Sequence, residues 1–141
     1  MKRAVIAAWC LVYLNASAVM AADATKFDLH CTGTNTKVGG NSPPSPWWNW
    51  FKIDLDTMEY CSVGCQSEPA VEPIKSVTSE TIVLTDTDDS IQQIGFASIN
   101  KITLNRVTGQ VRWENVIGSV HTIAQGACTP GPFTGFPPKK F

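Results

Sequence analysis

The sequence contains few charged residues and almost no histidine. Of its 141 residues, 16% are Asp, Glu, Lys or Arg, only two are His, and no run of Lys and Arg exceeds two residues. Proteins that bind nucleic acid draw much of their affinity from Lys and Arg side chains that contact phosphates. With a formal net charge of −1, the composition argues against a nucleic-acid partner.

Motifs that hold cofactors are also missing. The glycines of segment 33–40 match neither a P-loop nor a dinucleotide-binding loop. Ser119 does not lie in the G-x-S-x-G turn that presents a nucleophile. His30 and His121 are not spaced as ligands of one metal ion. We therefore expect no cofactor and no metal.

The sequence has no apolar run long enough to cross a membrane. Its longest run, residues 4–14, has eleven residues, whereas a hydrocarbon core of ~30 Å needs about twenty. This run follows Lys2 and Arg3 and precedes small residues, which is typical of a secretory signal peptide. We expect residues 1–22 to be removed and residues 23–141 to form one domain with a formal charge of −3. Export would place it in the periplasm or outside the cell, without stable membrane insertion.

Export determines how the cysteines are interpreted. The mature chain has four, which allow three pairings in an oxidising compartment: Cys31, Cys61, Cys65 and Cys128. We favour Cys61–Cys65, because a C-x-x-x-C pair can close a tight turn, and Cys31–Cys128, because these two lie near the chain ends. Zinc held by these thiols and a histidine is the alternative, but only one closely spaced pair is present.

Alternating apolar and polar residues predict β-strands throughout the mature chain. No window of a dozen residues carries a helical stripe with caps. Turn signals recur about every ten residues, which is typical of an antiparallel barrel or sandwich. We predict an all-β fold, a single small antiparallel barrel or sandwich of seven or eight strands in meander-like order. The expected strands are 26–31, 51–55, 58–61, 73–77, 81–85, 98–105, 111–113 and 117–124.

Glycine and proline mark the turns and the end of the chain. Gly109, after Arg106-Val107-Thr108, indicates a hairpin in which a positive φ is needed. Segment 39–46 contains three prolines and is predicted to be a loop. The Pro- and Phe-rich tail, 130–141, is not expected to form an ordinary strand, and its three phenylalanines predict that it lies across the surface.

Three carboxylates and one histidine are the candidate catalytic groups. Asp54 and Asp56 share one face of a predicted strand, and Glu59 lies just beyond the turn. Glycosidases use a pair of carboxylates as acid and as base or nucleophile. A small secreted hydrolase could use these groups together with His121. A solvated strand end has the same composition, so we favour a protein without enzymatic activity.

The aromatic run 47–51 (WWNWF) is the most distinctive segment. Extending the alternation back from Phe51 places Trp47 and Asn49 on the core face and Trp48 and Trp50 on the other face, beside Lys52 and Asp54. Exposed tryptophans next to polar groups can contact a sugar ring or an apolar side chain of a partner. We therefore predict a binding surface formed by Trp48, Trp50, Lys52 and Asp54. The alternative is that the tail or the proline loop covers them.

Several short motifs, in order along the mature chain, resemble those of small uncharacterised exported proteins of Gram-negative bacteria. They are FDLxCTG (27–33), IDLD (53–56), YCxxxC (60–65), NRxTG (105–109), GxC (126–128) and GFPxKxF (135–141). The resemblance implies a periplasmic or secreted location and a shared cysteine pairing. It brings no activity and no catalytic residues. The chain is more loosely similar to periplasmic lysozyme inhibitors, which are small disulfide-linked β-barrels.

These observations favour an exported, monomeric binding or envelope-maintenance protein that contacts an envelope glycan or a protein partner. The alternatives are the small hydrolase and a protein similar to the lysozyme inhibitors. Substitution separates the first two functions, because a binder depends on Trp48 or Trp50 and a hydrolase depends on the carboxylates.

Overall fold

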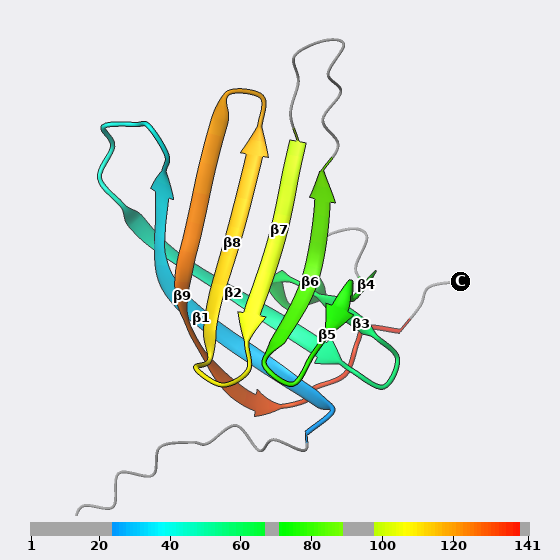
Figure 1. The fold of residues 1–141 in the computed structure, drawn as a ribbon. Coiled ribbons are helices and arrows are strands. Elements are labelled where there is room, and N and C mark those ends of the chain that lie inside the picture. The colour runs from blue at the N-terminus through cyan, green and yellow to red at the C-terminus, as the bar shows by residue number, and fades with distance from the viewer. Residues whose placement is uncertain (1–23, 67–70, 89–97, 139–141) are drawn as a thin grey trace, which may run out of the picture.

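The computed structural model describes residues 24–66, 71–88 and 98–138, and this part of the chain is built almost entirely of β-strands (Figure 1). The predicted signal peptide lies outside the described residues. The elements are β1 (Lys26–Lys37), β2 (Ser45–Asp54), β3 (Glu59–Cys61), a short turn η1 (Val63–Cys65), β4 (Glu72–Pro73), β5 (Ser76–Val77), β6 (Thr81–Asp88), β7 (Ser98–Asn105), β8 (Gln110–Ile117) and β9 (Val120–Pro132).

The strands form one antiparallel sheet in the order β4-β3-β2-β1-β9-β8-β7-β6-β5. Neighbours in the sheet are neighbours in sequence except for β1 and β9, which join two meanders. The sheet curls into a half-barrel, and Figure 1 shows β1 and β2 crossing behind the layer formed by β6 to β9. The predicted antiparallel all-β fold with meander-like order is therefore confirmed.

The segment from Glu72 to Val77 contacts both edges of this sheet. Its first part pairs with β3 as β4, and its last part pairs with β6 as β5. Between them, the N–H of Ile74 donates to the carbonyl of Met58 (2.8 Å) and the N–H of Lys75 donates to that of Val83 (3.0 Å). Because the backbone changes partner in its middle, the single predicted strand 73–77 appears as two short strands. The described residues thus contain nine strands rather than seven or eight.

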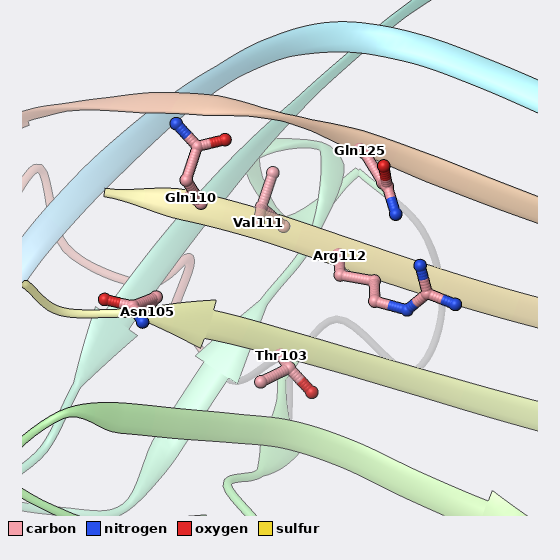
Figure 2. A pocket seen from close by; sticks show the side chains of 6 residues that line it. All are labelled: Thr103, Asn105, Gln110, Val111, Arg112 and Gln125. Carbon is pink, nitrogen blue, oxygen red and sulfur yellow. The ribbon is translucent and has the colours of Figure 1, made fainter. Parts of the chain in front are cut away.

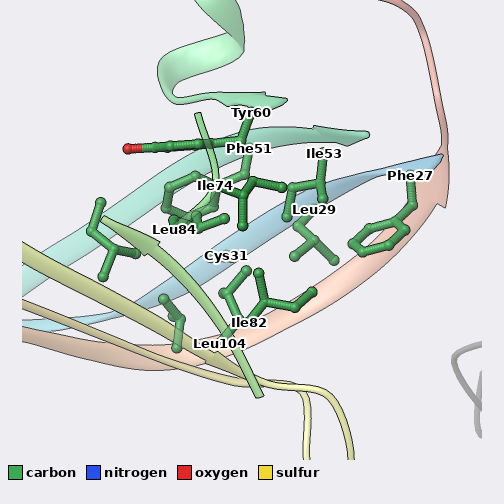
Figure 3. Packing of buried hydrophobic residues seen from close by; sticks show 12 residues of the cluster. Phe27, Leu29, Cys31, Phe51, Ile53, Tyr60, Ile74, Ile82, Leu84 and Leu104 are labelled. Carbon is green, nitrogen blue, oxygen red and sulfur yellow. The ribbon is translucent and has the colours of Figure 1, made fainter. Parts of the chain in front are cut away.

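The hydrophobic core lies inside the curl of the sheet. Figure 3 shows the side chains of β1 and β2 facing those of β6 and β7 across this space. Phe51, Ile53 and Leu84 are completely buried. Because side chains alternate between the two faces of a strand, every second residue points to this inner face. The remaining core residues are Phe27, Leu29, Cys31, Tyr60, Ile74, Ile82, Ile102, Leu104 and Val111.

Two glycines allow β1 and β9 to approach closely. Gly33 and Gly126 are directly opposite each other in the β1–β9 register. A Cβ on Gly33 would overlap the carbonyl of Gln125, and one on Gly126 would overlap the carbonyl of Thr32. Trp47 is opposite Gly33 in the β1–β2 register, and its ring meets that of Trp113 edge to face at 6.3 Å. Both tryptophans pack against the core.

The Cys31–Cys128 disulfide links the same two strands two residue pairs further along. These residues are opposite each other in the β1–β9 register, with their Cα atoms 4.0 Å apart. They are 97 residues apart in sequence. In the loop-entropy model, closing a loop of that length contributes about 4–5 kcal/mol. The second predicted disulfide, Cys61–Cys65, is also present.

The C-terminal part of β9 corrects the sequence analysis. The tail from Pro130 was not expected to form an ordinary strand, but β9 continues to Pro132 and pairs there with Phe27. The N–H of Cys128 donates to Gly109 on the side away from β1. The directions of backbone N–H groups alternate along a strand, so the nitrogens of the two prolines face the same side as that of Cys128. β8 does not extend beside them, because its first residue, Gln110, is opposite Ala127. Their missing N–H groups therefore remove no bond to β1.

Other strand ends differ from expectation in a similar way. β1 was expected to end at Cys31 but extends to Lys37, because its polar second half is hydrogen-bonded between β2 and β9. β2 begins at Ser45, inside the predicted proline loop. The hairpin at Gly109 is confirmed: its φ is +69° and its N–H donates to the carbonyl of Asn105 (2.9 Å).

The close contact of β1 and β9 predicts a severe effect of one methyl group. Gly126→Ala should lower the free energy of unfolding by about 3 kcal/mol, because the new Cβ would overlap backbone that cannot move without displacing β1. Gly131→Ala, on the same strand, has no atom near its Cβ and should change stability by less than about 0.5 kcal/mol. Urea unfolding of both variants checks this. Equal effects would contradict the β1–β9 register.

Candidate functional site

Strand β2 presents alternate aromatic residues to the two faces of the sheet. Trp47 packs against the core and Asn49 is only 3% exposed, so both lie on the inner side. Trp48, in contrast, is 68% exposed on the outer face. Trp50 shares that face but is only partly exposed. The structure thus places all four side chains on the faces that the alternation predicted.

Trp48, Trp50, His30 and Lys52 form one surface, which we call the aromatic surface. His30 is opposite Trp50 in the β1–β2 register, and their rings stack with centroids 4.8 Å apart. The ammonium of Lys52 lies 5.7 Å from the centre of the Trp50 ring, within reach of a cation–π contact. His30 is exposed. The sequence analysis did not place His30 here, because only the register of the β1–β2 pair brings it beside Trp50.

The disulfide-linked turn η1 supports the Trp50 ring. Val63, Gly64 and Cys65 all have left-handed backbone conformations, with φ of 50°, 63° and 68°. Such conformations cost about 1–2 kcal/mol per non-glycine residue. The Cys61–Cys65 disulfide spans the turn, and the N–H of Val63 donates to Asn49 Oδ1 (3.0 Å). A Cβ on Gly64 would lie 3.2 Å from the Trp50 ring, so the turn packs directly against the indole.

The C-terminal tail fixes the other end of the aromatic surface. The Thr134 hydroxyl donates to Asp28 Oδ2 (2.7 Å), and Asp28 is only 2% exposed. The Lys52 ammonium donates to the carbonyl of Gly135 (2.7 Å). Phe133 and Phe136 meet edge to face with centroids 5.3 Å apart. The tail thus lies against the start of β1 and the end of β2, across the surface as its phenylalanines predicted. Its bond to Lys52 holds that side chain beside Trp50.

Asp54 does not line the aromatic surface, although it was predicted to do so. It is 5% exposed, and its Oδ2 accepts a bond from the Lys26 ammonium at 2.9 Å. Its Oδ1 accepts the backbone N–H groups of Asp56 (3.0 Å) and Thr57 (3.2 Å), which closes the turn after β2. The alternation of side chains along β2 predicted the correct face for Asp54. Its burial and its bonds to the turn, however, give it a structural role.

These contacts favour the charged form of the Asp54 carboxyl. Burial alone would raise the pKa of its carboxyl, but the hydrogen bonds from Lys26 and the two backbone N–H groups outweigh burial and lower the pKa below its ordinary value. The bond to Asp54 likewise raises the pKa of Lys26. Asp54 is therefore a charged anchor rather than a proton donor.

The structure brings together three of the four candidate catalytic residues. Asp54 and Asp56 both contact Lys26 at the start of β1, and Glu59 lies directly opposite Asp54 in the β2–β3 register. The carbonyl of His121 accepts the N–H of Val38, just past the other end of β1. The two ends of this strand are separated by about 35 Å of extended chain. The structure therefore brings the three carboxylates to one end of β1 and β2, but not the histidine.

The actual partner of His121 is Glu114, which the sequence analysis did not single out. Nε2 of His121 lies 2.8 Å from Glu114 Oε1, and Arg112 donates to Glu114 Oε2 at 3.3 Å. Partial burial tends to raise the pKa of Glu114, but the bonds from His121 and Arg112 lower it below its ordinary value. Only the β8–β9 register reveals this cluster, which lies on the outer face of the sheet.

Neither a metal cluster nor a membrane-spanning helix is found in the described ranges. No group of three or more His, Cys, Asp or Glu side chains there is arranged to hold a metal ion. No helix within residues 24–66, 71–88 and 98–138 is long and apolar enough to cross a bilayer.

The anchoring role of Asp54 predicts an acid-sensitive contribution to stability. Asp54→Asn should lower the free energy of unfolding at neutral pH by about 1–2 kcal/mol, because the charged bond to Lys26 is lost. The folded-state pKa of Asp54 is lowered, so this contribution is complete above the unfolded-state pKa of about 3.9 and disappears as pH falls through the folded-state pKa. Urea unfolding from neutral pH down to about pH 2 measures it.

Asp56→Asn is the matched control for this change. The Asp56 side chain is 52% exposed and lies 3.4 Å from the Lys26 ammonium, so its removal should change stability by less than about 1 kcal/mol. Equal effects of the two substitutions, or an effect of Asp54→Asn that does not diminish in acid, would contradict the role of Asp54 as an anchor.

Comparison with known proteins adds no relative to this geometry: no family model, no curated protein and no solved structure matches the chain.

Proposed function

We propose that this protein is an exported, non-enzymatic binding protein of the bacterial envelope that contacts a glycan through the aromatic surface. The observation that carries the proposal is that Trp48 is 68% exposed, whereas the other aromatic residues of the described strands are buried or partly buried. Covering an exposed indole with a ligand removes apolar surface from water, which favours binding. Trp48 is therefore available for a contact rather than used in the core.

The neighbours of Trp48 favour a sugar over an apolar protein segment. Across the strands from Trp48, the residues in register with it are Thr32 on β1 and then Ala127 on β9. Two residues along each strand, Pro46 and Thr34 form the neighbouring pair on the same face. Protein interfaces have a buried apolar centre with several hydrophobic or aromatic residues. Here one indole face is adjacent to hydroxyl groups and the His30 imidazole. Such a combination matches the apolar face and the hydroxyl rim of a sugar ring.

The surface is held rigid before any ligand binds. Trp50 is fixed by His30 on the neighbouring strand and by the disulfide-linked turn around Gly64, and Lys52 is fixed by the tail. Rigid side chains lose little conformational entropy when they bind, which raises affinity for a given contact area. The two disulfides are also those expected of a protein that leaves the cytoplasm.

No described residue favours either alternative function. The hydrolase would use Asp54, Asp56 or Glu59 with His121, but Asp54 is ion-paired and closes a turn, and His121 lies toward the other end of β1. The similarity to lysozyme inhibitors stays a prediction from the sequence. We therefore place the function in binding, with envelope glycans such as peptidoglycan as the ligand class that an exported bacterial protein would meet.

Trp48→Ala should weaken binding to purified peptidoglycan and its soluble fragments by about 2 kcal/mol, roughly thirtyfold, because the contact face is removed. Its free energy of unfolding should stay nearly unchanged, because Trp48 contributes little to the core. Titration calorimetry and urea unfolding measure the two quantities. Acrylamide should quench Trp48 readily, and the glycan should protect it.

Trp47→Phe is the matched control, because Trp47 is the next residue but faces the core. It should lower stability and leave the affinity of the folded protein unchanged. If the wild-type protein does not bind purified glycan, or if Trp48→Ala binds as tightly as wild type, the aromatic surface is not a glycan site.

A further inference from the structure

An open depression lies on the outer face of the sheet, over β7, β8 and β9. It encloses about 290 Å³ and is lined by Thr103, Asn105, Gln110, Val111, Arg112 and Gln125. Figure 2 shows Thr103, Arg112 and Gln125 side by side on the three strands. The register places these three residues in one row, because Thr103 is opposite Arg112 and Arg112 is opposite Gln125. The depression therefore offers several amide and hydroxyl groups and one guanidinium.

Residues in register across β2, β1, β9 and β8 connect this depression to Trp48. Trp48 is opposite Thr32, Thr32 is opposite Ala127, and Ala127 is opposite Gln110. Neighbouring strands are ~4.8 Å apart, so the path from Trp48 to Gln110 is about 14 Å long. We call the side chains between the two sites the polar strip. They are all exposed and comprise Thr32, Thr34, Gln110, Gln125 and Ala127.

The polar strip has no charged side chain, whereas ion pairs flank it on both sides. Lys26 pairs with Asp54 and Asp56 at one end of the outer face. At the other end, Lys101 pairs with Asp86 (2.8 Å) and Glu114 pairs with Arg112 and His121. Repeated phosphates would need several Lys or Arg along the path, which the strip does not provide. Amide and hydroxyl groups instead suit a chain of sugar hydroxyls.

Arg112 is the one cation at the edge of the strip. One of its terminal nitrogens, Nη2, donates to Glu114 Oε2 at 3.3 Å, and the hydrogen bonds of the described residues include no other acceptor for this guanidinium. A guanidinium has five N–H donors in a planar arrangement that matches a carboxylate. The side chain of Arg112 is 46% exposed. It can therefore bind a carboxylate of a ligand without breaking an existing ion pair.

We propose that the depression is a second subsite for the same glycan chain, and that it takes a carboxylate-bearing sugar at Arg112 while an uncharged ring lies on Trp48. The inference rests on the proposed function, because it extends the Trp48 contact across the polar strip. A glycan strand that alternates N-acetylglucosamine with N-acetylmuramic acid has both kinds of unit. A disaccharide is too short to reach from Trp48 to the depression.

Three soluble probes separate the two subsites. They are a six-unit peptidoglycan glycan strand without peptides, the uncharged chitin hexamer with the same backbone, and the disaccharide of N-acetylglucosamine and N-acetylmuramic acid. Calorimetry on the wild-type protein should show the six-unit strand binding about tenfold more tightly than the chitin hexamer, because one charged hydrogen-bonded contact is added. The disaccharide should bind more weakly than either hexamer.

Substitutions then assign the preference to Arg112. Arg112→Gln should abolish the preference for the carboxylated strand, and Gln125→Ala should weaken both hexamers but not the disaccharide. Lys101→Gln, which removes a cation from the same face outside the strip, should leave the preference intact. Trp48→Ala should weaken binding of all three probes.

These outcomes distinguish the second subsite from the function on which it rests. Equal binding of the two hexamers by the wild type, or a preference that survives Arg112→Gln, would overturn the second subsite while the effect of Trp48→Ala stands. If Trp48→Ala changes the affinity for none of the probes, the proposed function itself is wrong.

Discussion

The pairing of β1 with β9 is the constraint on which the rest of the structure depends. Among the described strands it is the one hydrogen-bonded pairing of sequence-distant partners, and it joins the two meanders into one curled sheet. Gly33 and Gly126 allow the two backbones to approach, and the Cys31–Cys128 disulfide links them two residue pairs away. Non-local pairing requires loop closure before any contact forms, so a covalent link here stabilises the contact with the largest entropic cost.

The outer face follows directly from this pairing. The β1–β2 register places His30 beside Trp50, and the β1–β9 and β9–β8 registers extend the row of Trp48 to Gln110. A shift of one residue in the β1–β9 register would turn every side chain of one meander to the opposite face. The core, the aromatic surface and the polar strip are thus set by one alignment. The disulfide-linked turn η1 and the tail then hold Trp50 and Lys52 in position.

Local patterns predicted much of this structure, and long-range contacts account for what they missed. Alternation gave the all-β class and the faces of Trp47, Trp48 and Asn49, and the spacing of the cysteines gave both disulfides. These local patterns could not give the stacking of His30 on Trp50, the pair of His121 and Glu114, or the ion pair of Asp54 and Lys26, because each contact joins different strands. Pro130 and Pro132 fit into β9 only because their nitrogens point away from β1, to a side on which β8 does not extend past Ala127.

Side-chain NMR signals test most directly whether the ligand lies on the outer face. In a titration with the six-unit glycan strand, the indole N–H of Trp48 and the carboxamide groups of Gln110 and Gln125 should shift together. The indole signals of Trp47 and Trp113, which pack against the core, should stay in place. Shifts of Trp47 and Trp113 without shifts of Trp48 and Gln125 would place the ligand on the inner face and contradict this account.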